Sequence, residues 1–233
     1  MNTQITLGDI TADVRHKEIK NIHLSVYPPD GDVRISAPMH MPLETIRLFA
    51  ITKLDWIKRQ RRKFQTQERE PPRDYLERES HYLWGKRYLL HIVESNHPAS
   101  VELHPTAIVM HVRTGADTEK RHALMDAWYR AQLHEAIPPL IAKWELLMNV
   151  NVARFFVRRM KTKWGSCNPQ AHTIRLNTEL AKKPPIYLEY IVAHEMTHLI
   201  EPTHNARFVA LMDRFMPQWK QYRAQLNALP IGE

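Results

Sequence analysis

Residues 194–198 read His-Glu-Met-Thr-His, within a segment that is apolar on nearly every side. Positions four apart lie on the same face of a helix, so His194 and His198 can offer two imidazoles to one cation. Glu195 follows the first imidazole and can reach a water on that cation without being a ligand itself. Because an unpaired carboxylate is costly to bury, such a helix needs a partner for Glu195, and a cation with its water provides one. The motif therefore predicts a covered helix with a metal site on one face.

His204 is the predicted third ligand. Pro202 disfavours the α conformation at Glu201, so the helix should end there and let the chain turn back. His204 follows six residues after His198, which is the ligand spacing of the H-E-x-x-H-x-x-G-x-x-H motif, although Glu201 replaces the glycine of that motif. Asn205 can then cap the next helix.

Three histidine ligands leave one coordination position open, as a catalytic zinc site requires. Zinc lowers the pKa of bound water to about 7, and Glu195 would take the proton as the water attacks a carbonyl. We expect one zinc ion per chain, while such sites also accept other divalent ions. With 14 histidines in the chain, the alternative is a buried helix whose histidines are satisfied by other partners. Cys167 as a fourth ligand would close the site and indicate a structural zinc.

The rest of the composition is that of an ordinary globular protein, with 43% hydrophobic and 25% charged residues. The single cysteine cannot form an intramolecular disulfide, which suits a reducing compartment. The N-terminal stretch, residues 1–17, is polar and lacks the apolar core of a secretory signal. No apolar run approaches the length of about 18 residues that suggests a membrane span. We therefore expect a cytoplasmic protein with no membrane partner.

The formal net charge of +8 favours association with nucleic acid or anionic surfaces. The basic run at residues 58–63, with Trp56 and Phe64 nearby, could contact a nucleic-acid backbone. The alternative is a solvated amphipathic helix, whose C-terminal cations are favourable without any ligand.

Apolar periodicity and the positions of Pro and Gly predict the elements. The expected strands cover residues 19–27, 32–37, 87–94, 100–103, 107–113, 153–160 and 173–177. The expected helices cover residues 43–67, 119–149 with an interruption near Pro138, 185–200, and 205–227 with a break at Pro217. No internal repeat is visible, and residues 68–80 are the best candidate for a linker. Strands come early and helices late, which indicates α+β rather than a doubly wound sheet.

Four segments together resemble the YgjP-like metal-dependent hydrolases, which are grouped with SprT-like and M48-type zinc metallopeptidases. The segments are residues 161–168 (Lys-Thr-Lys-Trp-Gly-Ser-Cys-Asn), 174–177 (Ile-Arg-Leu-Asn), 190–199 around the histidine motif, and 204–208 (His-Asn-Ala-Arg-Phe). The resemblance implies a zincin-like, minimal gluzincin domain in which a small antiparallel sheet packs on the motif helix. It also implies that the three histidines are the ligands and that Glu195 is the catalytic acid/base.

Several neighbours of the motif are candidates with two interpretations each. Trp164 and Ser166 could lie in a loop that lines the cleft, or in a turn where Trp164 packs and Gly165 supplies special backbone angles. Residues 173–177 could be an edge strand that pairs with a peptide, or an ordinary core strand. Three further candidates could support a ligand or bind substrate, or could be surface pairs and core packing: Glu189, Tyr190 and Arg207.

The sequence thus predicts an N-terminal region of β-hairpin and basic helix, residues 1–80, and a catalytic region, residues 81–233, with the metal site at 184–216. The predicted activity is zinc-dependent hydrolysis of peptide bonds in a peptide or protein substrate. Two alternatives stay open. One is a nucleic-acid-associated factor with a structural or weakly active metal site. The other is an amidohydrolase that acts on small molecules, for which a closed pocket would be expected.

Overall fold

The computed structural model describes residues 2–27, 30–66 and 73–229. The chain forms two compact units, an N-terminal unit of residues 1–70 and a C-terminal unit of residues 71–232. Part of the predicted linker, residues 68–72, lies outside the described residues. Its remainder belongs to the C-terminal unit, where Tyr75 is only 8% exposed. The predicted domain boundary at residues 80 and 81 stays a prediction.

The N-terminal unit contains a four-stranded sheet of β1 (Asn2–Leu7), β2 (Ile10–Lys17), β3 (His23–Tyr27) and β4 (Asp32–Pro38), in the order β1-β2-β4-β3. The antiparallel pairing of β3 with β4 confirms the predicted hairpin. The β1–β2 hairpin was not predicted, although Ile5, Leu7 and Ile10 all face the core. Gly8 closes its two-residue turn with a φ of +68°, which glycine adopts without steric cost.

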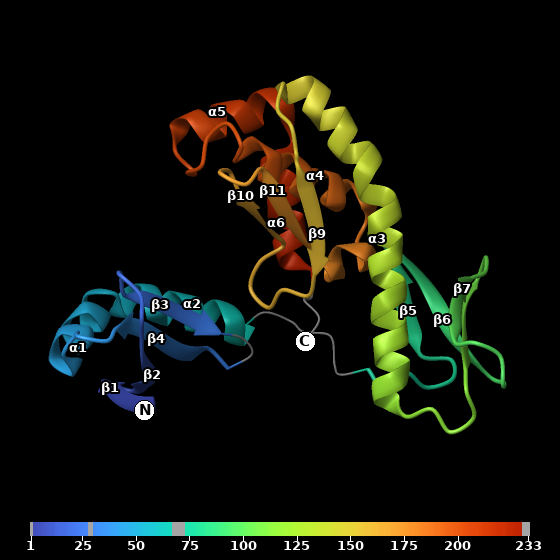
Figure 1. Ribbon diagram of the computed structural model, residues 1–233, viewed down its shortest axis with the longest axis horizontal. Coiled ribbons are helices and arrows are strands. Elements are labelled where there is room, and N and C mark those ends of the chain that lie inside the picture. Colours follow the sequence, from blue (N-terminus) through green and yellow to red (C-terminus); the bar gives the residue numbers. More distant parts are fainter. Residues whose placement is uncertain (1, 28–29, 67–72, 230–233) are drawn as a thin grey trace. The chain divides into compact units, whose positions relative to one another are not determined.

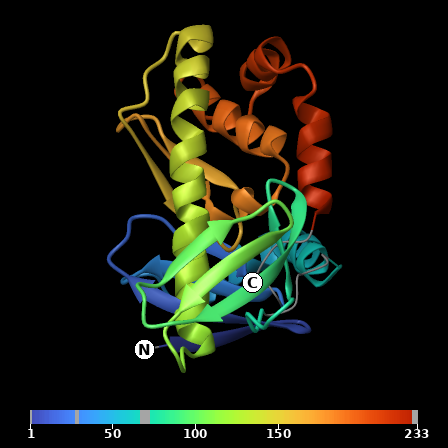
Figure 2. The ribbon, with the colours of Figure 1, turned by 90° about the vertical axis from the view of Figure 1, so that its right-hand side faces the viewer.

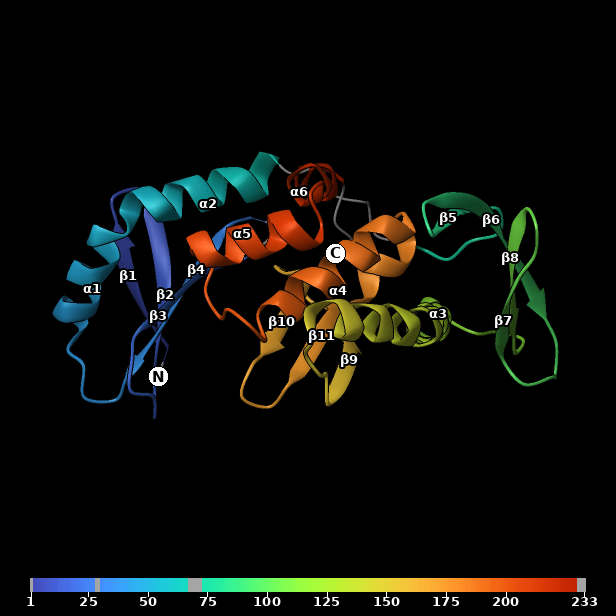
Figure 3. The same cartoon turned by 90° about the horizontal axis from the view of Figure 1, so that it is seen from above.

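Two helices, α1 (Leu43–Thr52) and α2 (Leu54–Thr66), cover one face of this sheet, as Figure 3 shows. A single helix was predicted here, but the chain departs from helical geometry at Lys53. The N-terminal unit has its own core, in which side chains from both helices meet the sheet at Ile46, Ala50 and Ile57.

The C-terminal unit begins with a second four-stranded sheet of β5 (Ser80–Leu83), β6 (Lys86–Glu94), β7 (Ser100–Leu103) and β8 (Ala107–Val112), in the order β5-β6-β8-β7. Its pairing repeats that of the first sheet: two antiparallel hairpins joined through a parallel inner pair. The repeat lies in the strand order and pairing, so it was not visible in the sequence.

The long helix α3 (Thr118–Met148) crosses this sheet with its N-terminal half (Figure 2). It runs without a break through Pro138 and Pro139, which contradicts the predicted interruption. A proline leaves the carbonyl four residues earlier without its helical partner. Here those carbonyls belong to His134 and Glu135, which are exposed and can be hydrated.

A three-stranded sheet follows, made of β9 (Arg154–Arg158), β10 (Gly165–Asn168) and β11 (Thr173–Asn177), in the order β10-β11-β9 (Figure 1). β10 and β11 are antiparallel, whereas β11 and β9 are parallel, so the sheet is mixed and not antiparallel as expected. The reason is the connection after β9. Residues 159–164 cross the end of β11 to reach the other edge, which makes β11 the central strand and β10 an edge strand. The interpretation of residues 173–177 as an edge strand was therefore wrong.

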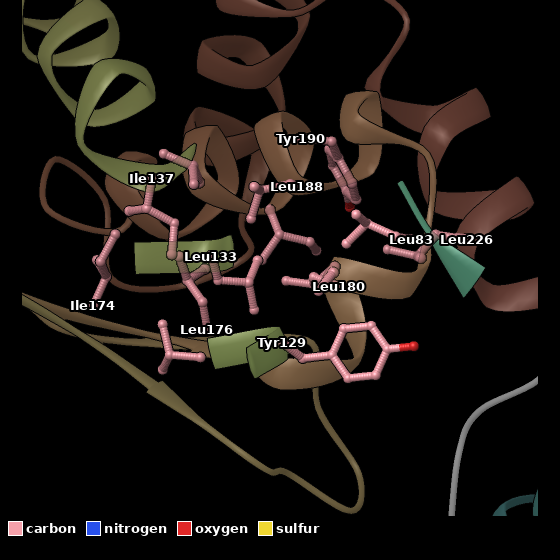
Figure 4. Close-up of a cluster of buried hydrophobic side chains, with 14 of the residues drawn as sticks. Leu83, Tyr129, Leu133, Ile137, Ile174, Leu176, Leu180, Leu188, Tyr190 and Leu226 are labelled. Atoms are coloured by element: carbon pink, nitrogen blue, oxygen red, sulfur yellow. The ribbon is translucent and has the colours of Figure 1, made fainter. Parts of the chain in front are cut away.

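The short 3-10 helix η1 (Thr178–Lys182) leads into α4 (Pro185–Thr197), α5 (Ala206–Phe215) and α6 (Trp219–Ala228). The predicted break near Pro217 is confirmed, while α4 ends three residues earlier than predicted. α4 contacts β10, β11 and α3. Figure 4 shows the core around it, in which Leu188 and Tyr190 of α4 belong to the same buried cluster as Leu133 and Ile137 of α3 and Leu176 of β11.

This arrangement confirms a mixed α+β fold and explains why the motif helix is apolar on nearly every side. Of the helices that the structure describes, none is both long and apolar enough to span a bilayer.

Candidate metal centre

Three histidine side chains converge at the end of α4. His194 lies in its last turn, His198 caps its C-terminus, and His204 lies in the loop before α5. Their candidate ligand atoms all lie within 4.8 Å of one another, and the Nε2 atoms of His194 and His204 are 3.0 Å apart. The structure therefore brings together the three histidines that the sequence singled out.

The turn that returns His204 to the helix is held by local hydrogen bonds. The backbone N–H of Glu201 donates to the carbonyl of Thr197 at 3.0 Å. The Glu201 carboxylate accepts from the backbone and the hydroxyl of Thr203. Asn205 caps α5 as predicted, because its Oδ1 accepts from the backbone N–H of Phe208 at 3.0 Å.

The histidines are held in the neutral form that binds metal. Burial is the main cause that lowers the pKa of His194 to about 3, and the charges of His198, His204 and Arg223 lower it further. Burial also lowers the pKa of His198 and of His204. The Nδ1 of His198 lies 3.1 Å from the carbonyl oxygen of Glu201. A carbonyl only accepts, so this nitrogen donates and the lone pair stays on Nε2.

The donor set fits zinc. Imidazole nitrogens that bind zinc at about 2.0–2.1 Å in tetrahedral geometry lie about 3.4 Å from one another. At this site one such separation is 3.0 Å and no pair of ligand atoms is more than 4.8 Å apart, so small side-chain movements would bring all three to one ion. Cys167 does not belong to the group, and burial followed by the charge of Glu195 raises the pKa of its thiol to about 12. A neutral thiol is a poor zinc ligand, so the closed four-ligand site that Cys167 would create finds no support.

Glu195 is 5% exposed and packs against the backbone of β10. A Cβ atom at Gly165 would lie 2.6 Å from its Oε1, so only glycine fits at this position. Gly165 does not have a positive φ, and the expectation that it supplies special backbone angles was wrong. Burial raises the pKa of Glu195 to about 8, while the charge of Lys163 lowers it. The carboxyl group therefore binds a proton more tightly than an exposed glutamate does.

The ring of Phe208 in α5 packs against all three histidine rings. The analysis of the sequence gave this residue no role. Its ring centroid lies 5.0, 4.6 and 4.7 Å from those of His194, His198 and His204, respectively. The side chain is 1% exposed. Phe208 follows His204 by four residues and lies in the first turn of the next helix. This spacing could have predicted that its ring lies near His204.

The Phe208→Ala substitution should lower the free energy of unfolding by about 3–5 kcal/mol, because it empties a fully buried site. It should also weaken metal binding, since the three imidazoles lose their common packing surface. Chemical denaturation with and without a chelator measures both effects. The control is Phe215→Ala on the same helix, where the ring is only half-buried and a smaller loss is expected. A loss below about 1 kcal/mol at position 208 would contradict this role.

Three of the predicted neighbours of the motif differ in their contacts with the histidine group: Tyr190, Trp164 and Ser166. The ring of Tyr190 is 3% exposed and meets the His194 ring edge-on at 5.8 Å. Its pKa is raised to about 12, mainly by burial. Trp164 is half-buried and packs against the core, and Ser166 pairs with Arg175 across the hairpin. The segment that contains both residues runs past Glu195 at Gly165.

Glu189 and Arg207 are not brought to the histidine group. Glu189 points to α3, where its carboxylate lies 2.5 Å from the Nζ of Lys143. Arg207 is exposed; the hydrogen bonds from Thr203 are the main cause that lowers the pKa of Glu201, and the charge of Arg207 adds to it. Two further cations act on the site electrostatically, and only the second of them had no place in the analysis of the sequence. They are Lys163, which acts on Glu195, and Arg223 of α6, which acts on His194 and His204.

The histidine group is open to solvent, because His204 is exposed. Two cavities of the C-terminal unit lie elsewhere. One of about 590 Å³ lies between α3 and the start of α4, and its lining includes Trp84, Leu140 and Glu189. The other, of about 500 Å³, lies between α3 and the start of β9. None of the three histidines lines either cavity.

Comparison with known proteins gives a family match over most of the chain. Residues 20–229 match the family described as YgjP-like, metallopeptidase domain. No curated protein matches the sequence. Among solved structures, the metallopeptidase zymogen abylysin of Pyrococcus abyssi is 18% identical, with a TM-score of 0.36; the match covers 38% of this chain and 89% of that one. The metallopeptidase zymogen jannalysin of Methanocaldococcus jannaschii is 20% identical, with a TM-score of 0.35 and coverage of 39% and 92%.

Proposed function

Because this chain belongs to the YgjP-like metallopeptidase family, we propose that it is a zinc-dependent peptidase whose metal is held by His194, His198 and His204 and whose general base is Glu195. Family membership makes the chain a metal-dependent hydrolase. The choice of zinc and the role of Glu195 rest on one observation: three neutral imidazoles converge, and the residue directly after the first of them is a buried glutamate. The assignment of the C-terminal unit to a zincin-like, minimal gluzincin fold is part of the same proposal.

The chemistry divides between the metal and the protein. When bound, zinc supplies a Lewis acid that polarises a carbonyl and makes water acidic near neutral pH. Glu195 takes the proton from the attacking water and later delivers it to the leaving amine. The backbone of Gly165 keeps the carboxyl group in place, since the missing side chain lets strand and carboxylate touch.

The shape of the site favours an extended peptide over a small amide. The histidine group is open, whereas a pocket for a small ligand encloses most of its surface. β10 is an edge strand, and one of its residues, Gly165, touches Glu195. A substrate that adds to this edge by main-chain hydrogen bonds would lie beside the carboxyl group. In this arrangement Trp164 and Ser166 would line the cleft.

A nucleic-acid partner finds no support in the comparisons. The basic run on α2 includes exposed Lys58 and Arg59, but Arg61 packs over the β3–β4 turn at Gly31. A solvated amphipathic helix, the alternative interpretation of this run, accounts for these contacts. Location in the cytoplasm stays an expectation.

Chelation provides the test of the proposed function. Treatment of the purified protein with a chelator should reduce the hydrolysis of an unstructured protein such as casein by at least about 100-fold, and added zinc should restore it. The release of fluorescent peptides from labelled casein measures the rate. Addition of magnesium in place of zinc is the control and should not restore hydrolysis, because magnesium disfavours three imidazole ligands. Hydrolysis that continues at the same rate after complete removal of metal would contradict the proposal.

A further inference from the structure

The side chain of Asn177 makes an unusually complete set of hydrogen bonds. Asn177 ends β11 and is 1% exposed. Its Nδ2 donates to the backbone carbonyls of Met160 at 2.7 Å and Lys163 at 2.8 Å. Its Oδ1 accepts from the backbone N–H of Met160 at 3.3 Å and of Glu179 at 3.2 Å. One amide group thus satisfies four backbone groups.

Three of these contacts hold the crossover loop, residues 159–164, which connects β9 to β10 across the end of β11. The backbone of Asn177 adds a fourth, since its N–H donates to the carbonyl of Trp164 at 2.9 Å. The loop presents two carbonyl groups, which accept hydrogen bonds, and one N–H group, which donates one. A single side chain can satisfy all three only if it has two donor hydrogens and an acceptor oxygen. Of the small side chains, only the asparagine amide offers both functions in this space. A backbone group that loses its hydrogen-bond partner in the folded chain is costly, so the loop depends on this residue.

The crossover loop leads directly to the candidate metal centre. Its last residue, Trp164, precedes Gly165, whose backbone touches the Glu195 carboxyl group. Lys163, whose carbonyl is bound by Asn177, also carries the cation that acts on Glu195. Movement of the loop would therefore shift both the wall behind Glu195 and a charge beside it.

We propose that Asn177 is a positioning residue for the hydrolysis: it fixes the crossover loop and, through Gly165, the place of the Glu195 carboxyl group. The proposal rests on the proposed function for its effect on catalysis. The contact between Asn177 and the loop does not depend on that function. The described hydrogen bonds of the Asn177 side chain all go to backbone atoms and none reaches a histidine, so its effect should fall on the chemical step and leave metal and substrate binding nearly unchanged.

The test compares two changes from amide to carboxylate in the same hairpin. Asn177→Asp keeps the acceptor and loses both donors, which places an anionic oxygen against two carbonyls. Asn168→Asp is the matched control, because Asn168 only accepts, from the backbone N–H groups of Gln170 and Ala171. We expect Asn177→Asp to bind one zinc per chain and to keep KM within about threefold of the wild type. We expect its kcat to fall about 100-fold, because a displacement of the Glu195 carboxyl group by about 1 Å has an effect of this size. We expect Asn168→Asp to match the wild type.

A kcat for Asn177→Asp within about threefold of the wild type would overturn the proposal. If this variant does not fold, Asn177→Ala leaves room for water at the site, and the same limit on kcat applies to it.

A measurement without catalysis separates this inference from the proposed function. In the wild-type protein, solvent exchange of the side-chain NH2 protons should be much slower at Asn177 than at Asn168, as followed by NMR. Equal exchange at the two residues would overturn the proposal even if the enzyme is active. Slow exchange at Asn177 in a protein that cleaves no peptide would leave the contact intact and refute the proposed function instead.

Discussion

Glu195→Gln is expected to bind zinc as the wild type does and to lose about 10²–10⁴-fold in kcat. The amide has the size of the carboxyl group and fits the same space against Gly165, but it cannot take a proton from water. The three histidines are untouched, so the metal should remain. Steady-state peptide hydrolysis gives kcat, and elemental mass spectrometry gives the zinc content of the same preparation.

The matched control for this substitution is Glu189→Gln, on the same helix. Glu189 pairs with Lys143 on the side of α3, away from the histidines, so its loss should change stability slightly and leave kcat unchanged. A Glu195→Gln enzyme that keeps more than about a tenth of the wild-type kcat would remove Glu195 from the mechanism. If the Glu195→Gln enzyme keeps both its zinc and its full activity, the general base must be another residue.

Gly165→Ala is expected to lose about 100-fold in activity while retaining zinc. The added methyl group would lie 2.6 Å from the Glu195 Oε1 and 2.8 Å from its Cγ, which is closer than real Cβ contacts allow. Because Glu195 is buried, its side chain has little room to yield, and either the carboxyl group or β10 has to move. The rate of peptide hydrolysis and the zinc content, measured as for Glu195→Gln, check this result.

A double substitution distinguishes this contact from a general disturbance of the strand. Glu195→Asp shortens the side chain and makes room for the methyl group at position 165. If the two residues interact as described, the losses from Gly165→Ala and Glu195→Asp should not add in the double variant. Strict additivity of the two losses, or a Gly165→Ala enzyme within about threefold of the wild type, would contradict the contact.

The sequence predicted the histidine group well because its geometry is local. The spacing of His194 and His198 follows from the helical period, and Pro202 with Asn205 sets where one helix ends and the next begins. Phe208 belongs to the same local pattern, but an aromatic residue on an apolar face has many possible neighbours. Its position under the rings became evident only in the folded chain.

The contacts made through strand pairing could not be predicted in this way. The approach of Gly165 to Glu195 depends on which strand lies at the edge of the sheet, and the sequence contains no signal for that order. The parallel pairing of β9 with β11 depends on the path of the crossover loop, so both the antiparallel sheet and the edge position of residues 173–177 were wrong. The continuity of α3 through Pro138 likewise depends on solvent access to the freed carbonyls.

The central claim is that three imidazoles hold one metal ion, and metal content tests it most directly. Elemental mass spectrometry on protein purified without a histidine tag should find one zinc per chain in the wild type and in the surface control His134→Ala. His198→Ala, which removes one of the three ligands, should retain close to none after dialysis. A wild-type protein without bound metal under zinc-replete conditions, or a His198→Ala variant that retains its full zinc, would contradict the account.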